Sequence, residues 1–171
     1  MNNIDRLNLE GFGKFFFQYL PMYKFLNVFY FISNRQVIVQ KLALIVDGRP
    51  DTELDLTQDL KEIAKKKFVI KEGIKFRIRI DFVVQREIVT GLRYVQKTSG
   101  LGVTVDKMKY MVGSYAPKAT PHSYTTPYED APTGMAGRGS YHVTSFFTDD
   151  DQNSHLKWEW AIEVKKDWAE Q

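Results

Sequence analysis

Few side chains in this sequence stand at spacings that support catalysis or metal binding. The three histidines are His122, His142 and His155. They are scattered along the chain, and none has a partner at the spacing of a metal ligand. The three consecutive aspartates at 149–151 resemble a calcium loop only superficially, because its glycine and terminal glutamate are missing. We therefore expect an acidic turn there, and no catalytic residue, metal site or cofactor.

The composition excludes further kinds of chemistry. The 171 residues include no cysteine, which rules out disulfides, thiolate metal sites and a cysteine nucleophile. A formal net charge of +3 is too small to indicate nucleic-acid binding, and the lysines at 65–67 lack interleaved aromatic residues. No phosphate-binding glycine loop or nucleophile elbow occurs. The sequence favours a binding protein that is not an enzyme.

Alternation of apolar and polar residues predicts the strands that must position any binding site. The clearest strand is 75–85, which is half-buried and antiparallel. Its apolar face carries Phe76, Ile78, Ile80, Phe82 and Val84. The last strand, 156–164, has an equally apolar face, formed by Leu156, Trp158, Trp160, Ile162 and Val164. Residues 36–46 predict a strand that is partly buried on both sides.

The remaining segments complete an all-β pattern. Residues 68–76 predict a hairpin with its turn at Glu72 and Gly73, and residues 116–137 a long surface connection. Short strands separated by turns predict an immunoglobulin-like antiparallel β-sandwich from residue 36 onward. Two such sheets either close on themselves or part enough to admit an apolar ligand, and the pattern alone leaves both possibilities open.

The first 35 residues differ from the rest of the chain. Ten of the 24 aromatic residues lie there. Residues 12–33 are long enough to suggest a membrane helix, but Lys14, Pro21 and Lys24 interrupt them. We therefore divide the chain into an aromatic-rich extension, 1–35, and a sandwich domain, 36–171.

Several long motifs in the domain resemble one known family. They are REIVTGLRYVQ at 86–96, MVGSY at 111–115, and FTDDD followed by HLKWEW between residues 147 and 160. From about Gln36 to the C-terminus the sequence resembles the Rho GDP-dissociation inhibitor family. This resemblance implies an apolar slot between the sheets that takes the geranylgeranyl tail of a prenylated Rho, Rac or Cdc42-type GTPase. It also implies that the GTPase is kept GDP-bound, soluble and off membranes.

The resemblance assigns roles to individual positions. Those that match the lipid slot are Leu44, Phe68, Phe76, Ile88, Tyr110, Val143 and Trp160. Those that match acidic contacts with the GTPase are Asp106, Glu129, Asp130 and Asp151. The implied protein is a cytoplasmic monomer that forms a 1:1 complex, meets membranes only indirectly and binds no nucleic acid.

The resemblance stops where relatives carry an acidic N-terminal arm that blocks nucleotide release. Residues 1–35 contain no acidic run. The alternative function is therefore a prenyl-lipid carrier that solubilises its cargo without controlling nucleotide release. Three explanations of the extension compete: a variant without the arm, a membrane-anchoring segment, or an upstream non-coding stretch translated in a faulty gene model. We favour the last, because a complete sandwich offers such a segment no obvious partner.

Overall fold

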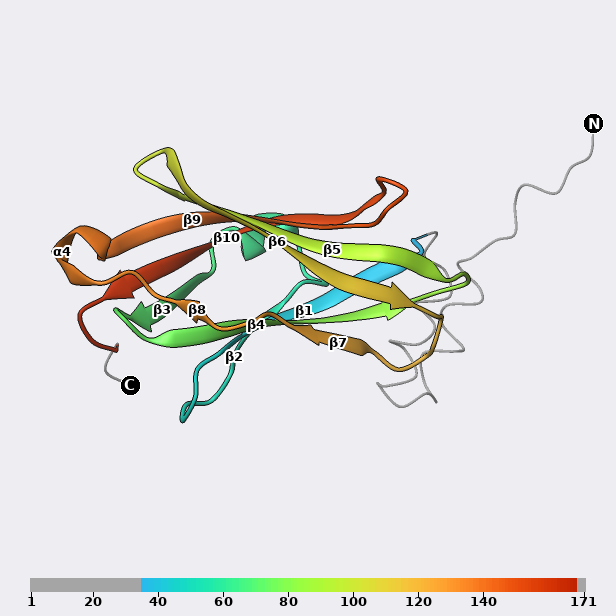
Figure 1. The fold of residues 1–171 in the computed structure, drawn as a ribbon, viewed down its shortest axis with the longest axis horizontal. Coiled ribbons are helices and arrows are strands. Elements are labelled where there is room, and N and C mark those ends of the chain that lie inside the picture. Colours follow the sequence, from blue (N-terminus) through green and yellow to red (C-terminus); the bar gives the residue numbers. More distant parts are fainter. Residues whose placement is uncertain (1–34, 169–171) are drawn as a thin grey trace, which may run out of the picture. The chain divides into compact units, whose positions relative to one another are not determined.

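The computed structural model describes residues 35–168, which form two five-stranded sheets packed face to face (Figure 1). The strands of the first sheet are β1 (Val37–Ile45), β2 (Thr52–Asp55), β4 (Lys75–Val84), β7 (His122–Thr125) and β8 (Glu129–Asp130). Those of the second are β3 (Lys67–Lys71), β5 (Val89–Gly100), β6 (Val103–Tyr115), β9 (Gly139–Thr148) and β10 (Ser154–Lys165). Two single-turn helices, α3 (Leu60–Ile63) and α4 (Gly134–Gly137), connect strands.

The order of the first sheet is β2-β1-β4-β7, with β8 paired to β4, and that of the second is β3-β10-β9-β5-β6. The predicted all-β sandwich is therefore confirmed. One pairing departs from the antiparallel expectation, because β3 runs parallel to β10. What the sequence predicts for residues 1–34 lies outside the described residues. Between residues 35 and 168, no helix has the length and apolar character needed to cross a membrane.

Strand β4 has the two faces that its alternation predicts. Phe76, Ile78, Ile80 and Phe82 are buried, whereas the intervening residues are partly exposed. On the outer face Arg79 lies 2.8 Å from Asp51, and the Ser123 hydroxyl donates to Asp81 at 2.6 Å. The wet face is thus held by an ion pair and a hydrogen bond to a carboxylate, and the apolar face supplies one wall of the core.

An irregularity in strand β1 explains why its sequence indicated burial on both sides. The register against β4 shifts between Val39 and Lys41, which marks a β-bulge. Before the bulge Val37 and Val39 are buried, and after it Leu42 and Leu44 are. Because an extra residue reverses which side chains face inward, a single alternation cannot describe the whole strand.

The predicted hairpin at 68–76 is wrong. Strands β3 and β4 belong to different sheets, so the turn between them crosses the sandwich. Its backbone bonds elsewhere: the Glu72 amide donates to the Lys165 carbonyl, and the Gly73 amide to the Pro132 carbonyl. Gly73 has a φ of +69°, which suits glycine. A turn signal with flanking alternation predicts a reversal of the chain, but it does not say that the two strands pair.

The predicted surface connection at 116–137 is more ordered than expected. It contributes β7 and β8, which both pair with β4, and then α4. These short strands have too few residues for an alternating pattern to be visible. Their pairing matters for function, because it brings residues 129–132 to the gap between the sheets.

The core lies between the sheets and is mainly aromatic in its centre. Phe82 on β4 and Phe147 on β9 meet across the sandwich with ring centroids 5.1 Å apart. Trp158 and Tyr94 stack within the second sheet at 6.1 Å, and both are fully buried. The centre of the sandwich is therefore filled by aromatic side chains.

Candidate functional site

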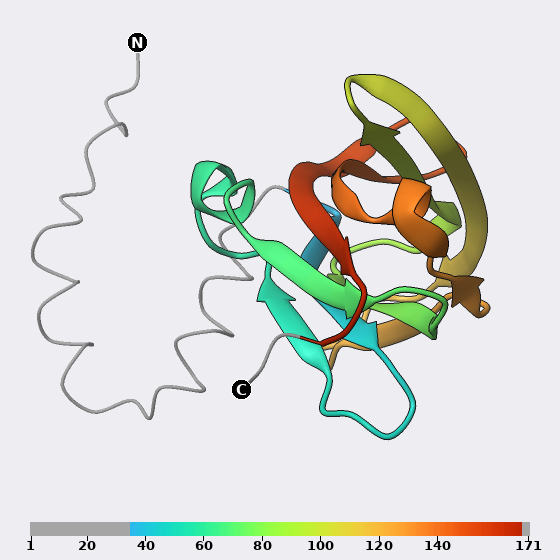
Figure 2. The same cartoon turned by 90° about the vertical axis from the view of Figure 1, so that its left-hand side faces the viewer.

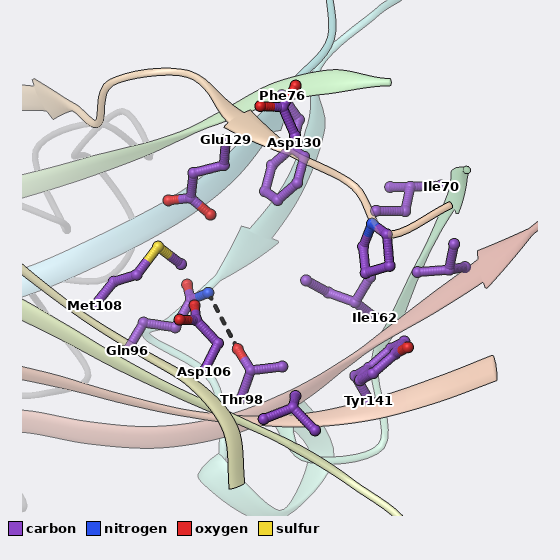
Figure 3. A pocket seen from close by; sticks show the side chains of 13 residues that line it. Ile70, Phe76, Gln96, Thr98, Asp106, Met108, Glu129, Asp130, Tyr141 and Ile162 are labelled. Atoms are coloured by element: carbon purple, nitrogen blue, oxygen red, sulfur yellow. Dashed lines mark hydrogen bonds between the residues drawn. The ribbon is translucent and has the colours of Figure 1, made fainter. Parts of the chain in front are cut away.

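A half-open cleft of about 280 Å³ lies between the two sheets. Figure 3 shows its lining, and Figure 2 views the end of the sandwich that carries α4, next to which the cleft lies. Its apolar lining comes from Ile70, Phe76, Val105, Met108, Pro132, Tyr141, Ile162 and Val164. Its polar lining comes from Gln96, Thr98, Asp106, Glu129 and Asp130. Both sheets contribute, and most of the lining residues are apolar, as in pockets for small apolar ligands.

The acidic side of the cleft is dominated by Glu129, which is half-buried and lies near Asp106. Burial raises the pKa of the Glu129 carboxyl to about 7, and the nearby Asp106 adds to the rise. The Tyr110 hydroxyl donates to Glu129 at 3.2 Å and partly offsets it. Burial, and then Glu129, raise the pKa of Tyr110 to about 12, so this hydroxyl keeps its proton. The cleft therefore carries a carboxylate whose charge changes near neutral pH.

Replacing Glu129 by glutamine is expected to stabilise the protein at pH 8. Glu129 binds its proton more tightly in the folded chain than in the unfolded chain, so stability falls as pH rises from about 4.5 to about 7. A neutral amide removes this penalty while still accepting from Tyr110. The gain at pH 8 is on the order of 2 kcal/mol after allowance for solvent screening, and at pH 5 it is below about 1 kcal/mol. Urea unfolding at both pH values measures it; equal gains at both would contradict this assignment.

The structure brings part of the predicted lipid set together around the cleft. Phe76 lines it, and Tyr110 lies beside it through its bonds to Glu129 and the Met108 sulfur. Phe68 and Trp160 contact each other, with ring centroids 5.2 Å apart, and Val143 is the register partner of Trp160. Phe68, Val143 and Trp160 are buried and do not themselves line the cleft.

Two predicted lipid positions lie elsewhere. Leu44 is buried in the core opposite Ile78 and does not line the cleft. Ile88 precedes β5, and its side chain is 64% exposed. Neither residue is adjacent to the 280 Å³ space, so their contact with a ligand stays a prediction from the resemblance.

The four predicted GTPase contacts separate into two regions. Asp106, Glu129 and Asp130 line the cleft, and the first and last of these are exposed. Asp151 lies in the exposed turn between β9 and β10. The other ends of these two strands, at Gly139 and Val164, are near the cleft. Three of the acids could contact one basic segment at the cleft, and Asp151 would contact a different part of a partner.

The aspartates at 149–151 form a turn with divided roles. Asp149 is buried and accepts from the Asn153 amide at 2.9 Å and from the His155 ring at 2.8 Å. Asp150 pairs with Arg93, and Asp151 is exposed. The expected acidic turn is confirmed. Within residues 35–168, no group of three histidine, aspartate or glutamate side chains is placed to hold a metal ion.

Other lining residues were not predicted. Ile162 and Val164 belong to the apolar face of β10 that the alternation identified, so their inward direction could be read, but not their place at the cleft. Gln96 is 2% exposed, and it stands on the inward side of β5. A glutamine at an inward position of an alternating strand is the signal that could have identified it.

Comparisons with known proteins identify the class to which this fold and cleft belong. A family model described as RHO protein GDP dissociation inhibitor matches residues 18–167. Rho GDP-dissociation inhibitor 1 of Homo sapiens is 51% identical over 135 residues, which cover 78% of this chain and 66% of that protein. The Rho GDP-dissociation inhibitor of Schizosaccharomyces pombe is 44% identical over 138 residues, covering 80% and 67%. The chain belongs to the Rho GDP-dissociation inhibitor family.

Two further facts define the extent of the similarity. The chain spans about two thirds of the length of the curated relatives it matches, and the family match begins inside the predicted extension 1–35. Among solved structures, a Niemann-Pick type C2 protein from Japanese carpenter ant aligns with a TM-score of 0.48 and 11% identity, covering 75% of this chain and 93% of that one. The relatives are named as inhibitors of GDP dissociation, which are regulators rather than enzymes.

Proposed function

We propose that this protein binds the geranylgeranyl tail of Rho, Rac or Cdc42-type GTPases in the cleft and keeps them GDP-bound, soluble and off membranes. The observation that carries the proposal is the cleft itself, which is apolar within and acidic on one side. The protein acts as a cytoplasmic monomer in a 1:1 complex and meets membranes only through its cargo. The names of its relatives support the choice of cargo.

The physical argument concerns competition with a bilayer. Each buried methylene contributes about 0.8 kcal/mol, so a chain of about 20 carbons carries a transfer free energy on the order of 10 kcal/mol. A slot between two sheets removes such a chain from water, whereas an open surface does not. Because one prenyl chain anchors weakly, a basic segment usually supplies the second membrane signal. Asp106, Glu129 and Asp130 offer that segment an alternative to anionic lipids.

Val105 and Val103 provide a matched pair of variants that tests lipid binding. Both are exposed on β6, by 55% and 67%, but only Val105 lines the cleft. Val105→Asp places a charge against the lipid and is expected to weaken binding of the prenylated GTPase at least tenfold, about 1.4 kcal/mol. Val103→Asp should change it less than about twofold, because this side chain does not line the cleft. Titration of labelled GTPase measures both.

The controls separate the lipid from the GTPase body. Wild-type protein should bind the prenylated form at least about a hundredfold more tightly than the unprenylated form, since most of the binding free energy is apolar burial. Equal affinity for the two forms would refute lipid binding in the cleft. Ile88→Asp tests the resemblance beyond the cleft: weaker binding would add Ile88 to the lipid contacts, and unchanged binding would remove it.

The alternative function is a prenyl-lipid carrier without control of the nucleotide. Residues 1–35 favour it, because they contain only two acidic residues, Asp5 and Glu10. The rate of GDP release from prenylated Rac separates the two functions. Saturating amounts of an inhibitor slow this release, whereas a carrier leaves it at the rate of the free GTPase.

A further inference from the structure

A continuous set of hydrogen bonds crosses the inner face of the second sheet. The Trp160 indole nitrogen donates to Ser145 Oγ at 3.0 Å, and the Ser145 and Tyr94 hydroxyls lie 3.1 Å apart. The Tyr94 hydroxyl donates to Gln96 Oε1 at 2.7 Å. Gln96 Nε2 reaches Thr98 Oγ1 at 3.5 Å, the dashed line in Figure 3. We call Tyr94, Gln96, Ser145 and Trp160 the polar band.

The chemistry of these groups fixes the direction of every bond. An indole nitrogen only donates, so Ser145 Oγ accepts from Trp160. The hydrogen of Tyr94 is committed to Gln96, so Ser145 must supply its own hydrogen to the Tyr94 oxygen. Burial raises the pKa of Tyr94, which keeps this hydroxyl a donor. The band is therefore a satisfied network in one fixed arrangement, of the kind that resists rearrangement.

The polar band lies at the boundary between the closed core and the cleft. Along the inward side of β5, Leu92 and Tyr94 are fully buried in the core, whereas Gln96 and Thr98 line the cleft. Gln96 is the register partner of Ser145 on β9, so the boundary continues across the sheet. Gln96 alone both belongs to the band and lines the cleft.

The position of the band has a consequence for a chain that enters the cleft. An apolar chain cannot replace the hydrogen bonds that it separates, and a buried polar group without a partner costs more than one buried methylene contributes. The free energy of binding therefore becomes more favourable with each buried carbon until the chain meets Gln96, and less favourable if the chain goes further. The opposite direction, towards Val105, is open, so the band limits depth at the inner end only.

We propose that the polar band is the inner stop of the cleft and sets how much of a prenyl chain the protein can bury, with Gln96 as the residue that the chain end meets. The proposal rests on the proposed function, since it concerns a lipid in the same cleft. It makes Gln96 a determinant of how affinity depends on chain length, a role that its neighbour Thr98 does not share.

The test is a chain-length series of S-prenyl cysteine methyl esters with 10, 15, 20 and 25 carbons. We expect the affinity of wild-type protein to rise with chain length up to 20 carbons and to change less than about threefold from 20 to 25 carbons, because the additional carbons stay outside the open end of the cleft. Gln96→Ala should raise the affinity for the 25-carbon ester at least tenfold and leave that for the 15-carbon ester within about threefold. Thr98→Ser, which changes the cleft lining but keeps the hydroxyl that accepts from Gln96, should keep the wild-type profile. Tryptophan fluorescence titration measures all three proteins.

A second variant covers the case in which Gln96→Ala does not fold. Tyr94→Phe keeps the ring in the core and removes only the hydroxyl that holds Gln96, so it should raise the 25-carbon affinity about threefold. The proposal is overturned if a folded variant at Gln96 or Tyr94 keeps the wild-type plateau between 20 and 25 carbons, or if the affinity of wild-type protein rises tenfold or more from the 20-carbon to the 25-carbon ester. Failure to bind any ester would instead refute the proposed function.

Discussion

Replacing Trp160 by alanine is expected to lower the free energy of unfolding by about 3–5 kcal/mol, the usual loss for a large aromatic side chain in a core. Trp160 is 1% exposed, packs against Phe68 and donates to Ser145. The substitution removes the packing, leaves a cavity at the inner end of the cleft, and takes a donor from a buried hydroxyl. Urea unfolding measures the change as a lower midpoint with an unchanged slope.

Two further tryptophan variants serve as comparisons for Trp160→Ala. Trp160→Phe keeps most of the packing and removes the N–H donor, so its loss should be about 1–2 kcal/mol. Trp168→Ala serves as the control, because Trp168 is only partly buried and lies under the Arg49 guanidinium at 4.1 Å. Its loss should stay near 1 kcal/mol. A loss at Trp160 no larger than that at Trp168 would contradict the placement of Trp160 in the core.

Asp149→Ala is expected to destabilise the protein by about 3 kcal/mol, because it removes the buried acceptor of the β9–β10 turn. Asn153 donates to Asp149 through both its backbone and side-chain nitrogens, and the His155 ring nitrogen lies 2.8 Å away. Because an ionised carboxylate only accepts, that ring nitrogen carries a hydrogen. All of these donors lose their acceptor at once in the variant.

The two neighbouring aspartates supply matched controls for the Asp149 experiment. Asp150 is half-exposed and pairs with Arg93, so Asp150→Ala should cost no more than about 1 kcal/mol. Asp151 is exposed, and its replacement should have almost no effect. Thermal or urea unfolding of the three single variants ranks them. Equal losses at 149 and 151 would show that the buried acceptor does not hold the turn.

Asp149 also predicts an acid dependence. Burial alone would raise the pKa of Asp149, but the hydrogen bonds from Asn153 and the contact with His155 outweigh it and hold that pKa below its usual range. The carboxylate therefore contributes stability above about pH 4, and this stability is lost as pH falls through the folded-state pKa. Asp149→Ala should flatten this part of the pH profile, whereas Asp151→Ala should leave it unchanged.

Sequence patterns predicted the parts of this fold in which local and tertiary preferences agree. Strand β4 alternates because one face meets the core and the other meets water, and the structure has that arrangement. The prediction of a hairpin at 68–76 is wrong because alternation indicates which face of a strand is buried and carries no information on its pairing partner. Strand β3 pairs with β10, about ninety residues later, and no local signal marks that partner.

The site was predicted unevenly for a similar reason. The resemblance supplied Phe76, Glu129 and Asp130, which line the cleft, and also Ile88, which does not. It carries positions from relatives without the local packing that decides which of them meet the cavity. The polar band could not be predicted from the sequence, because its members are ordinary residues in three separate strands. Only the register between β5, β9 and β10 brings them together.

The parallel pairing of β3 with β10 has a consequence for synthesis on the ribosome. Strand β3 is complete long before β10 emerges, and among the described residues β10 is the one strand that pairs with it. Until β10 arrives, the nascent chain keeps the facing edges of β3 and β9 unpaired, which favours aggregation and binding by chaperones. The second sheet is therefore complete only once β10 has emerged from the ribosome, and loss of β10 by premature termination prevents its completion.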